Sequence, residues 1–123
     1  MENKKIAIIG VGNMGGAIAK GLLKSGSVKS GDIFVSDRKE SILEEMRAMS
    51  INICQGNSEA VKNADVVIVA VKPYHIENVI DEIKNELTPE KIFISIVAGV
   101  GIVRAVFLTL TTFSSGHHFQ FLI

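Results

Sequence analysis

Five short runs of apolar residues alternate with amphipathic segments along the first hundred residues of the chain. The first run, Ile6–Ile9, has no polar interruption, which is typical of a parallel strand that is buried on both faces. From Met14 onward the apolar residues follow helical spacing, at Met14, Ala17, Ile18 and Leu22. The later apolar runs predict four more strands, over residues 33–36, 51–54, 66–71 and 92–97.

The segments between these runs have helical patterns. Ser41, with Glu44 three residues later, has the pattern of an N-terminal capping box, and Ile42, Met46 and Met49 then form one apolar face. Residues 58–62 leave room only for a brief helical turn. An apolar stripe over residues 76–87 predicts a helix that ends at Thr88-Pro89. Its solvated side carries Glu77, Asp81, Glu82, Lys84 and Glu86.

This alternation predicts the fold class. Strands joined by crossover segments, with right-handed connections as the default, form an α/β fold with a doubly wound parallel sheet. A chain of 123 residues is long enough for a single domain with a core of its own. We therefore expect one domain of five or more parallel strands.

Glycines at positions 10, 12 and 15 lie between the first strand and the first helix. In a dinucleotide-binding loop the first glycine permits the tight turn, the second lets backbone N–H groups approach a pyrophosphate, and the third lets the helix pack on the sheet. A glycine-rich turn without a ligand is the alternative, but the strand before the motif and the helix after it favour dinucleotide binding. The pattern predicts a Rossmann-like NAD(P)-binding fold.

The composition narrows the partners. Lys plus Arg and Asp plus Glu both number 13, so the formal net charge is 13 − 13 = 0, and nothing favours nucleic acid or an anionic membrane. Cys54 is the single cysteine, and we expect it to be a small buried residue in a reduced, cytoplasmic protein. Because Met1 leads almost directly into the first strand, we expect no targeting segment.

The last part of the chain differs in character. Arg104 is the last charged residue, and residues 105–123 hold four of the six phenylalanines. Polar residues interrupt this tail too often for a membrane span, and its composition favours strands or aggregation. Adjacent His117 and His118 lack further ligands nearby, so we expect no metal site. We divide the chain into a dinucleotide-binding domain, 1–100, and an atypical uncharged tail, 101–123.

Three segments resemble the N-terminal domain of the pyrroline-5-carboxylate reductase family. They are Gly-Val-Gly-Asn-Met-Gly-Gly-Ala-Ile at 10–18, Asn-Ala-Asp-Val-Val-Ile-Val-Ala-Val-Lys-Pro at 63–73, and Ser-Ile-Val-Ala-Gly-Val at 95–100. The resemblance spans about residues 4 to 100. It implies an oxidoreductase of proline biosynthesis, an amino-acid biosynthetic enzyme that reduces the small molecule 1-pyrroline-5-carboxylate to L-proline with NAD(P)H.

The resemblance also implies positions for the cofactor. Gly10, Gly12, Asn13, Met14 and Gly15 match the family's pyrophosphate loop. Asn57 matches an asparagine near the adenosine end. Ala70, Val71, Lys72 and Pro73 match the loop that lines the cofactor after the fourth strand, and Ala98 and Gly99 would lie toward the nicotinamide.

The end of the second strand bears on the choice between NADP and NAD. Asp37 follows Ser36 and lies 37 − 15 = 22 residues past Gly15, near the spacing at which an acidic residue binds the ribose 2′-hydroxyl of NAD. Arg38 and Lys39 come next, and a guanidinium pairs well with a 2′-phosphate. The family generally prefers NADPH. We therefore expect NADP, with NAD as the alternative, and take Ser36, Asp37 and Arg38 as cofactor-binding residues.

The chain departs from the family after Val100, where the family continues into a helical domain that binds the imine and forms the dimer. No catalytic residue is therefore named in this sequence. A dinucleotide-binding module or truncated fragment without catalysis is one alternative. A β-hydroxyacid or prephenate-type dehydrogenase is another, but it explains residues 70–73 poorly. We expect the uncharged tail to support self-association into a homo-oligomer.

Overall fold

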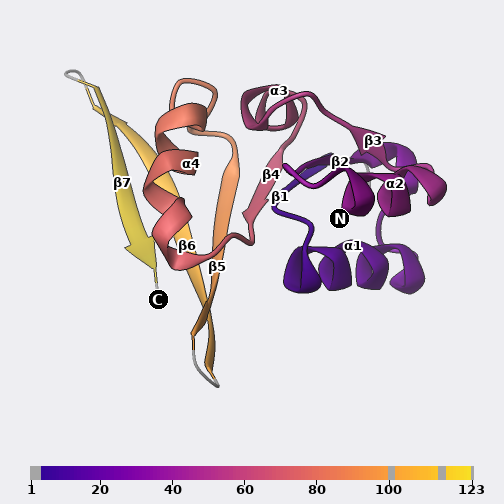
Figure 1. The fold of residues 1–123 in the computed structure, drawn as a ribbon. Helices are drawn as coiled ribbons and strands as arrows, with labels where there is room; N and C mark the ends of the chain where they lie inside the picture. Colours follow the sequence, from indigo (N-terminus) through magenta and orange to yellow (C-terminus); the bar gives the residue numbers. More distant parts are fainter. Residues whose placement is uncertain (1–3, 100–101, 114–115, 123) are drawn as a thin grey trace.

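The computed structural model describes residues 4–99, 102–113 and 116–122 (Figure 1). Its strands are β1 (Ile6–Ile9), β2 (Ile33–Ser36), β3 (Asn52–Ile53), β4 (Val66–Val69), β5 (Ile92–Gly99), β6 (Ile102–Phe113) and β7 (Gly116–Leu122). They form one sheet with the order β3-β2-β1-β4-β5-β6-β7. Two short 3₁₀ helices, η1 (Ser30–Asp32) and η2 (Pro73–His75), lie in the connections before β2 and after β4.

The first five strands are parallel, which confirms the predicted doubly wound α/β sheet. Strand β1 lies at the centre, and its Ile8 is level with Val35 of β2 on one side and Ile68 of β4 on the other. β3 pairs with β2, and β5 pairs with β4, both in parallel. The carboxyl ends of β1, β2 and β4 therefore meet at one edge of the sheet, where open α/β sheets bind their ligands.

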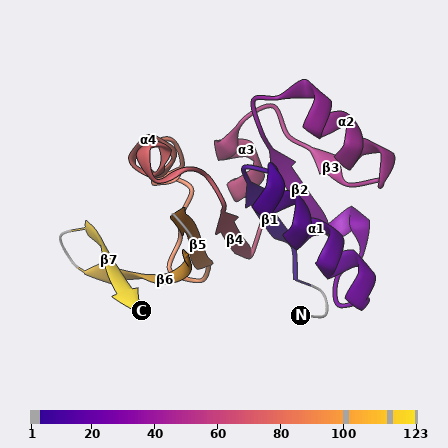
Figure 2. The ribbon, with the colours of Figure 1, turned by 60° about the horizontal axis from the view of Figure 1, so that its bottom comes forward.

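Four α-helices cover the parallel part of the sheet: α1 (Asn13–Ser25), α2 (Glu40–Ala48), α3 (Asn57–Lys62) and α4 (Ile76–Ile83). In Figure 2, α3 and α4 lie on the opposite side of the strands from α1. Helices α1 and α2 share the other face, and an ion pair between Lys20 and Glu45 joins them.

The alternation of side chains along each strand creates two cores. Ala7 and Ile9 of β1 belong to the core under α3 and α4, whereas Ile6 and Ile8 belong to the core under α1 and α2. These four side chains are at most 1% exposed. A strand that is apolar at every position is thus buried on both faces, as its sequence predicted.

Helix boundaries differ from expectation in two places. The predicted capping box is wrong, because α2 already begins at Glu40 and its N-cap residue, Lys39, makes no side-chain capping bond. The amide of Leu43 donates to the carbonyl of Lys39, so the first turn closes before Ser41 could cap it. The other difference is at α4, which ends at Ile83 and not at Thr88-Pro89. A turn follows this helix, in which the N–H of Glu86 donates to the carbonyl of Ile83.

The tail forms strands, as its composition predicted. β6 runs antiparallel to β5 along the whole length of β5, from Ile92 opposite Thr109 to Gly99 opposite Ile102. β7 pairs antiparallel with β6 and is the last strand in the sheet order. The division of the chain at residue 100 stays a prediction, and Val100 lies outside the described residues. In the described part of the chain, no helix is both long and apolar enough to cross a membrane.

Candidate functional site

A cavity of about 790 Å³ opens at the carboxyl ends of the central strands. Its lining comes from the loop between β1 and α1, the end of β2, the start of α3, the loop after β4 and one face of α4. Eleven of the residues predicted to bind a cofactor line it: Gly10, Gly12, Asn13, Met14, Ser36, Asp37, Arg38, Asn57, Ala70, Val71 and Lys72. Folding therefore brings four separated segments of the sequence to one site.

The backbone and packing of the protein require glycine at two of the three positions in the loop. Gly10 has a φ of +85°, and a Cβ atom there would lie 2.8 Å from the carbonyl oxygen of Ala70. A Cβ atom on Gly15 would overlap the carbonyl oxygen of Gly10, so Gly15 lets α1 pack against the loop. Gly15 thus lies behind the loop rather than among the residues that line the cavity.

Gly12 is different. A Cβ atom on Gly12 would meet nothing within 4 Å, although the residue lines the cavity. Packing inside the protein therefore gives no reason for glycine at this position. Close approach of a ligand to the backbone provides one.

The N-terminus of α1 opens at the same place. Its N-cap residue is Gly12, which makes no side-chain capping bond, and its first turn contains no acidic residue. The backbone N–H groups of a first turn have no partner within the helix and carry a positive partial charge. An anion such as a pyrophosphate fits this end of the helix.

The end of β2 lies beside the glycine loop. Ser36 is 5% exposed, and its carbonyl oxygen accepts a 2.9 Å hydrogen bond from the N–H of Gly10. The Asp37 carboxylate accepts the N–H of Val11 at Oδ2, at 2.8 Å, and the N–H of Lys39 at Oδ1, at 2.9 Å. Arg38 and Lys39 are exposed at the rim of the cavity.

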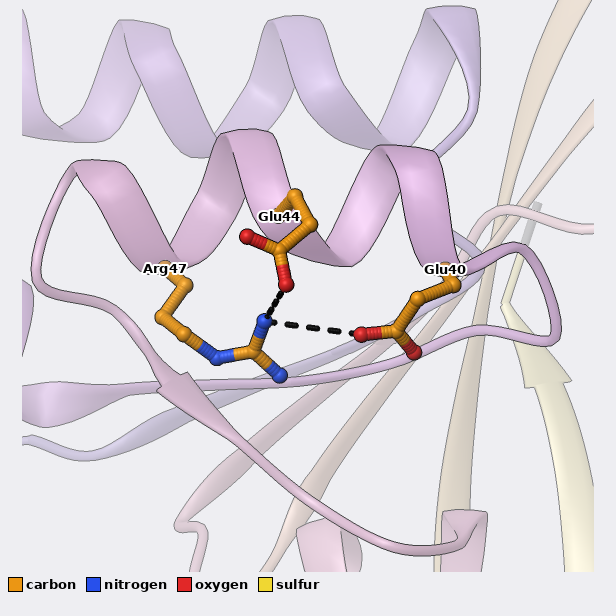
Figure 3. Close-up of polar contacts among 3 residues, drawn as sticks. All are labelled: Glu40, Glu44 and Arg47. Carbon is orange, nitrogen blue, oxygen red and sulfur yellow. Dashed lines mark hydrogen bonds and ion pairs between the residues drawn. The ribbon is translucent and has the colours of Figure 1, made fainter.

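Arg47 is an arginine with a different role. Figure 3 shows its guanidinium between Glu44 and Glu40 on α2, with a distance of 3.5 Å from Nη1 to Glu40 Oε1. Arg47 is not part of the cavity lining. Arg38 is therefore the arginine that the described lining offers to a ligand.

The opposite wall includes residues that the sequence analysis missed. Asn57 donates a 2.7 Å hydrogen bond from Nδ2 to Glu82 Oε2, and Asn78, one turn before Glu82 on α4, also lines the cavity. The rings of Tyr74 and His75, which lie 4.3 Å apart between centroids, line it as well. The helical pattern placed Glu82 on the solvated side of its helix. The sequence did contain an indication of this, because α4 begins soon after β4. Its solvated side therefore borders the edge of the sheet where ligands bind.

Three predicted residues are placed only by their backbone. Pro73 begins η2, and Ala98 and Gly99 end β5 opposite Val103 and Ile102. Their contact with a cofactor stays a prediction.

Cys54 is not among the residues that line the cavity. It is 7% exposed in the core under α3 and α4, as expected for a small buried residue. Burial, with a smaller effect of the nearby Glu59 carboxylate, raises the pKa of its thiol to about 11. Among the residues that the structure describes, no three His, Cys, Asp or Glu side chains gather as a metal site would require.

A glycine loop that joins a buried parallel strand to an uncapped helix, at the carboxyl edge of a doubly wound sheet, defines a dinucleotide-binding domain of the Rossmann type. Comparison with known families agrees. The chain belongs to the family described as NADP oxidoreductase coenzyme F420-dependent, whose profile matches residues 5–99.

The relatives are more specific, and they confirm the resemblance to pyrroline-5-carboxylate reductases. The chain is 43% identical over 101 residues to the pyrroline-5-carboxylate reductase of Methanosarcina acetivorans, covering 81% of this chain and 37% of that relative. It is 40% identical over 100 residues to the enzyme of the same name from Escherichia coli, covering 79% and 36%. The match lies in the N-terminal part of these relatives.

A solved structure supports the same conclusion. The pyrroline-5-carboxylate reductase from Coxiella burnetii superposes with a TM-score of 0.73 at 34% identity, covering 80% of this chain and 37% of that one. An imine reductase from Myxococcus stipitatus in complex with NADP+ superposes with a TM-score of 0.64 at 26% identity, covering 77% and 32%. The chain thus spans little more than a third of the length of these three pyrroline-5-carboxylate reductases.

Proposed function

We propose that this chain is the cofactor-binding part of an NADP-dependent pyrroline-5-carboxylate reductase, an oxidoreductase of proline biosynthesis. The observation that carries the proposal is the cavity at the glycine loop, where eleven predicted cofactor residues meet. The names of the relatives favour this reaction over a β-hydroxyacid or prephenate-type dehydrogenase.

The pyrophosphate would bind at the loop. Gly12 leaves room for it, and the first turn of α1, which contains no acidic residue of its own, supplies N–H donors and positive potential. Asn13 and Met14, which begin the helix, also line this part of the cavity.

The 2′-phosphate of NADP would bind at the end of β2. Arg38 offers a planar guanidinium that pairs with phosphate oxygens through two hydrogen bonds, and Lys39 adds a second cation. The imine reductase that superposes on this chain is described in complex with NADP+, which favours the same choice, and a variant of it is described in complex with NAD+. NAD remains the alternative, since it would use the loop without the phosphate contact.

The adenosine would lie near Asn57, and the rest of the cofactor would run past Ala70, Val71 and Lys72 toward Pro73, Ala98 and Gly99. When bound, the reduced nicotinamide would supply the hydride which, together with a proton on the nitrogen, converts the imine of 1-pyrroline-5-carboxylate into the amine of proline. The residues of this chain bind and orient the cofactor for that transfer. The catalytic residues of the reaction stay unassigned.

We expect the 123 residues by themselves to offer the imine only one wall of a reaction site. Hydride transfer needs the nicotinamide and the imine carbon held about 3–3.5 Å apart in a site with little water. We therefore expect the purified chain to bind cofactor but to turn over slowly or not at all. A binding module without catalysis is the corresponding second candidate.

Calorimetric titration of the chain with NADP and with NAD tests the proposal. We expect micromolar dissociation constants, with NADP bound more tightly. Binding of neither cofactor would overturn the proposed function. Oxidation of NADPH that depends on pyrroline-5-carboxylate, compared with reduction of NADP by candidate hydroxy acids, then separates the reaction classes. Turnover with a hydroxy acid only would exclude the reductase.

We also propose that the protein is cytoplasmic and forms a homo-oligomer. The single, buried cysteine supports a reducing compartment, and the uncharged edge strand β7 supports self-association.

A further inference from the structure

The carboxylate of Asp37 joins two loops that a dinucleotide would contact. Its Oδ2 accepts the N–H of Val11 in the glycine loop, across 26 residues of sequence, and its Oδ1 accepts the N–H of Lys39 two residues further along the chain. The carbonyl of Ser36 accepts the N–H of Gly10 beside these bonds. The pyrophosphate loop is therefore fastened to the end of β2 at two successive residues.

These hydrogen bonds indicate a role for the acidic residue at the end of β2 that differs from the usual one. In NAD-binding domains a carboxylate at this position accepts hydrogen bonds from the ribose hydroxyls, and its charge would repel a 2′-phosphate. Here each carboxylate oxygen already accepts a backbone N–H group. Hydrogen bonds to a charged acceptor are strong, so these two bonds hold the Asp37 carboxylate against its backbone donors.

The same bonds fix the residues that would hold the phosphate. Because the Lys39 amide is held by Asp37, the backbone of the turn from Asp37 to Lys39 is fixed, and Arg38 extends from the middle of that turn. One side chain, Asp37, thus connects the pyrophosphate loop to the turn that carries these two cations.

We infer that Asp37 is a positioning residue, which couples the pyrophosphate loop to the turn that carries Arg38 and Lys39, and is not the residue that selects NAD. This inference rests on the proposed dinucleotide binding. Arg38 and Lys39 then determine the preference for NADP, whereas the Asp37 carboxylate supports the affinity for both cofactors.

Four titrations test the assignment. Asp37→Ala is compared with the unaltered chain for binding of NADP, NAD, ADP-ribose, which lacks the 2′-phosphate, and 2′,5′-ADP, which lacks the pyrophosphate. We expect all four dissociation constants to rise, by about tenfold for the two cofactors, with the ratio between NAD and NADP changed less than about threefold. Weaker binding of NAD together with tighter binding of NADP would overturn the inference.

Two variants serve as controls. Asp37→Asn keeps one carbonyl oxygen as an acceptor, so its dissociation constants should fall between those of the unaltered chain and Asp37→Ala. Asp32 lies at the opposite end of β2, outside the cavity lining, and Asp32→Ala should leave all four constants unchanged. Circular dichroism checks that each variant is folded at the titration temperature. A change in a dissociation constant then reflects binding and not unfolding of the variant.

Amide hydrogen exchange keeps the inference separate from the proposed function. If the unaltered chain binds neither cofactor, the proposed function fails, but the coupling of the loops is still measurable without ligand. Exchange at the Val11 and Lys39 amides should be faster in Asp37→Ala and unchanged in Asp32→Ala. Unchanged exchange at both amides in Asp37→Ala would overturn the positioning role.

Discussion

The side-chain amide of Asn57, at the start of α3, donates a 2.7 Å hydrogen bond to the carboxylate of Glu82 on α4. Both residues line the cavity, and they lie 25 residues apart in the sequence. The bond orients the amide of Asn57 and leaves its carbonyl oxygen as an acceptor, which under the proposed function would serve the adenosine end of a cofactor.

We expect Glu82→Ala to weaken NADP binding about two- to fivefold, because a hydrogen bond of this kind contributes on the order of 1 kcal/mol. Calorimetric titration measures the effect. Glu77, an exposed glutamate on the same helix that does not line the cavity, provides the control variant Glu77→Ala. Tighter binding in Glu82→Ala would mean that the carboxylate acts mainly by repelling the anionic cofactor, which contradicts the orienting role.

Substitutions at Gly12 and Gly15 should separate binding from folding. Gly15→Ala places a Cβ atom against the carbonyl oxygen of Gly10, and relieving such overpacking costs about 1–3 kcal/mol of stability. Gly12→Ala meets no protein atom within 4 Å, so it should leave the melting temperature nearly unchanged while weakening cofactor binding. Thermal denaturation and titration of both variants check this pair. Equal loss of stability in the two would contradict it.

Arg38 and Arg47 provide a matched pair for the NADP preference. Arg38→Ala should weaken NADP binding about tenfold or more and NAD binding much less, because a charge-assisted bond to the 2′-phosphate is lost. Arg47 pairs with Glu40 and Glu44 outside the cavity, so Arg47→Ala should change neither affinity. If Arg38→Ala affects both cofactors equally, Arg38 is a solvated surface charge and the preference must arise elsewhere.

Cys54 should make stability sensitive to alkaline pH. The pKa of its thiol is raised to about 11 in the folded chain, first by burial and then by Glu59. The unfolded thiol ionises near its usual value of about 8.5 while the folded thiol stays protonated. This contribution to stability is complete below about pH 8.5 and is lost as the pH rises toward 11.

Urea denaturation at pH 7.5 and pH 10 measures the effect of Cys54. Because alkaline pH affects more of the chain than this thiol, the unaltered chain is compared with Cys54→Ala, which lacks only the thiol. The difference in stability between the two chains should shrink at pH 10. A difference that is the same at both pH values would contradict the raised pKa.

The tail should promote self-association. β7 is the last strand of the described sheet, and residues 105–123 contain no Asp, Glu, Lys or Arg that would discourage pairing with another edge. We expect light scattering to report a species larger than a monomer, and a smaller one after removal of residues 105–123. A monomer with the tail intact would contradict this prediction.

The order of strands and helices followed from local pattern. Ile6–Ile9 and Val66–Val69 are apolar at every position, and such runs have few stable places other than the interior of a parallel sheet. The glycine loop was likewise recognisable, because the backbone requirements of the turn at Gly10 and the close contact at Gly15 are local to the motif. Periodicity therefore sufficed for the fold class, whereas the residues predicted to line the cavity came from the glycine motif, the spacing at the end of β2 and the family resemblance.

The local sequence pattern did not predict the contacts of polar groups that have more than one possible partner, or whose partner comes from a distant part of the chain. Ser41 and Glu44 have the spacing of a capping box, but the helix starts earlier, and Glu44 pairs with Arg47 instead (Figure 3). The role of Asp37 depends on Val11, and that of Glu82 depends on Asn57. A hydrogen bond needs its atoms within a few tenths of an ångström of one position. The sequence by itself determined which segments form the sheet, because burial depends on the pattern of apolar residues. Only the tertiary structure decided which polar groups meet at the edge of the sheet, because that depends on how strands and helices distant in the sequence pack together.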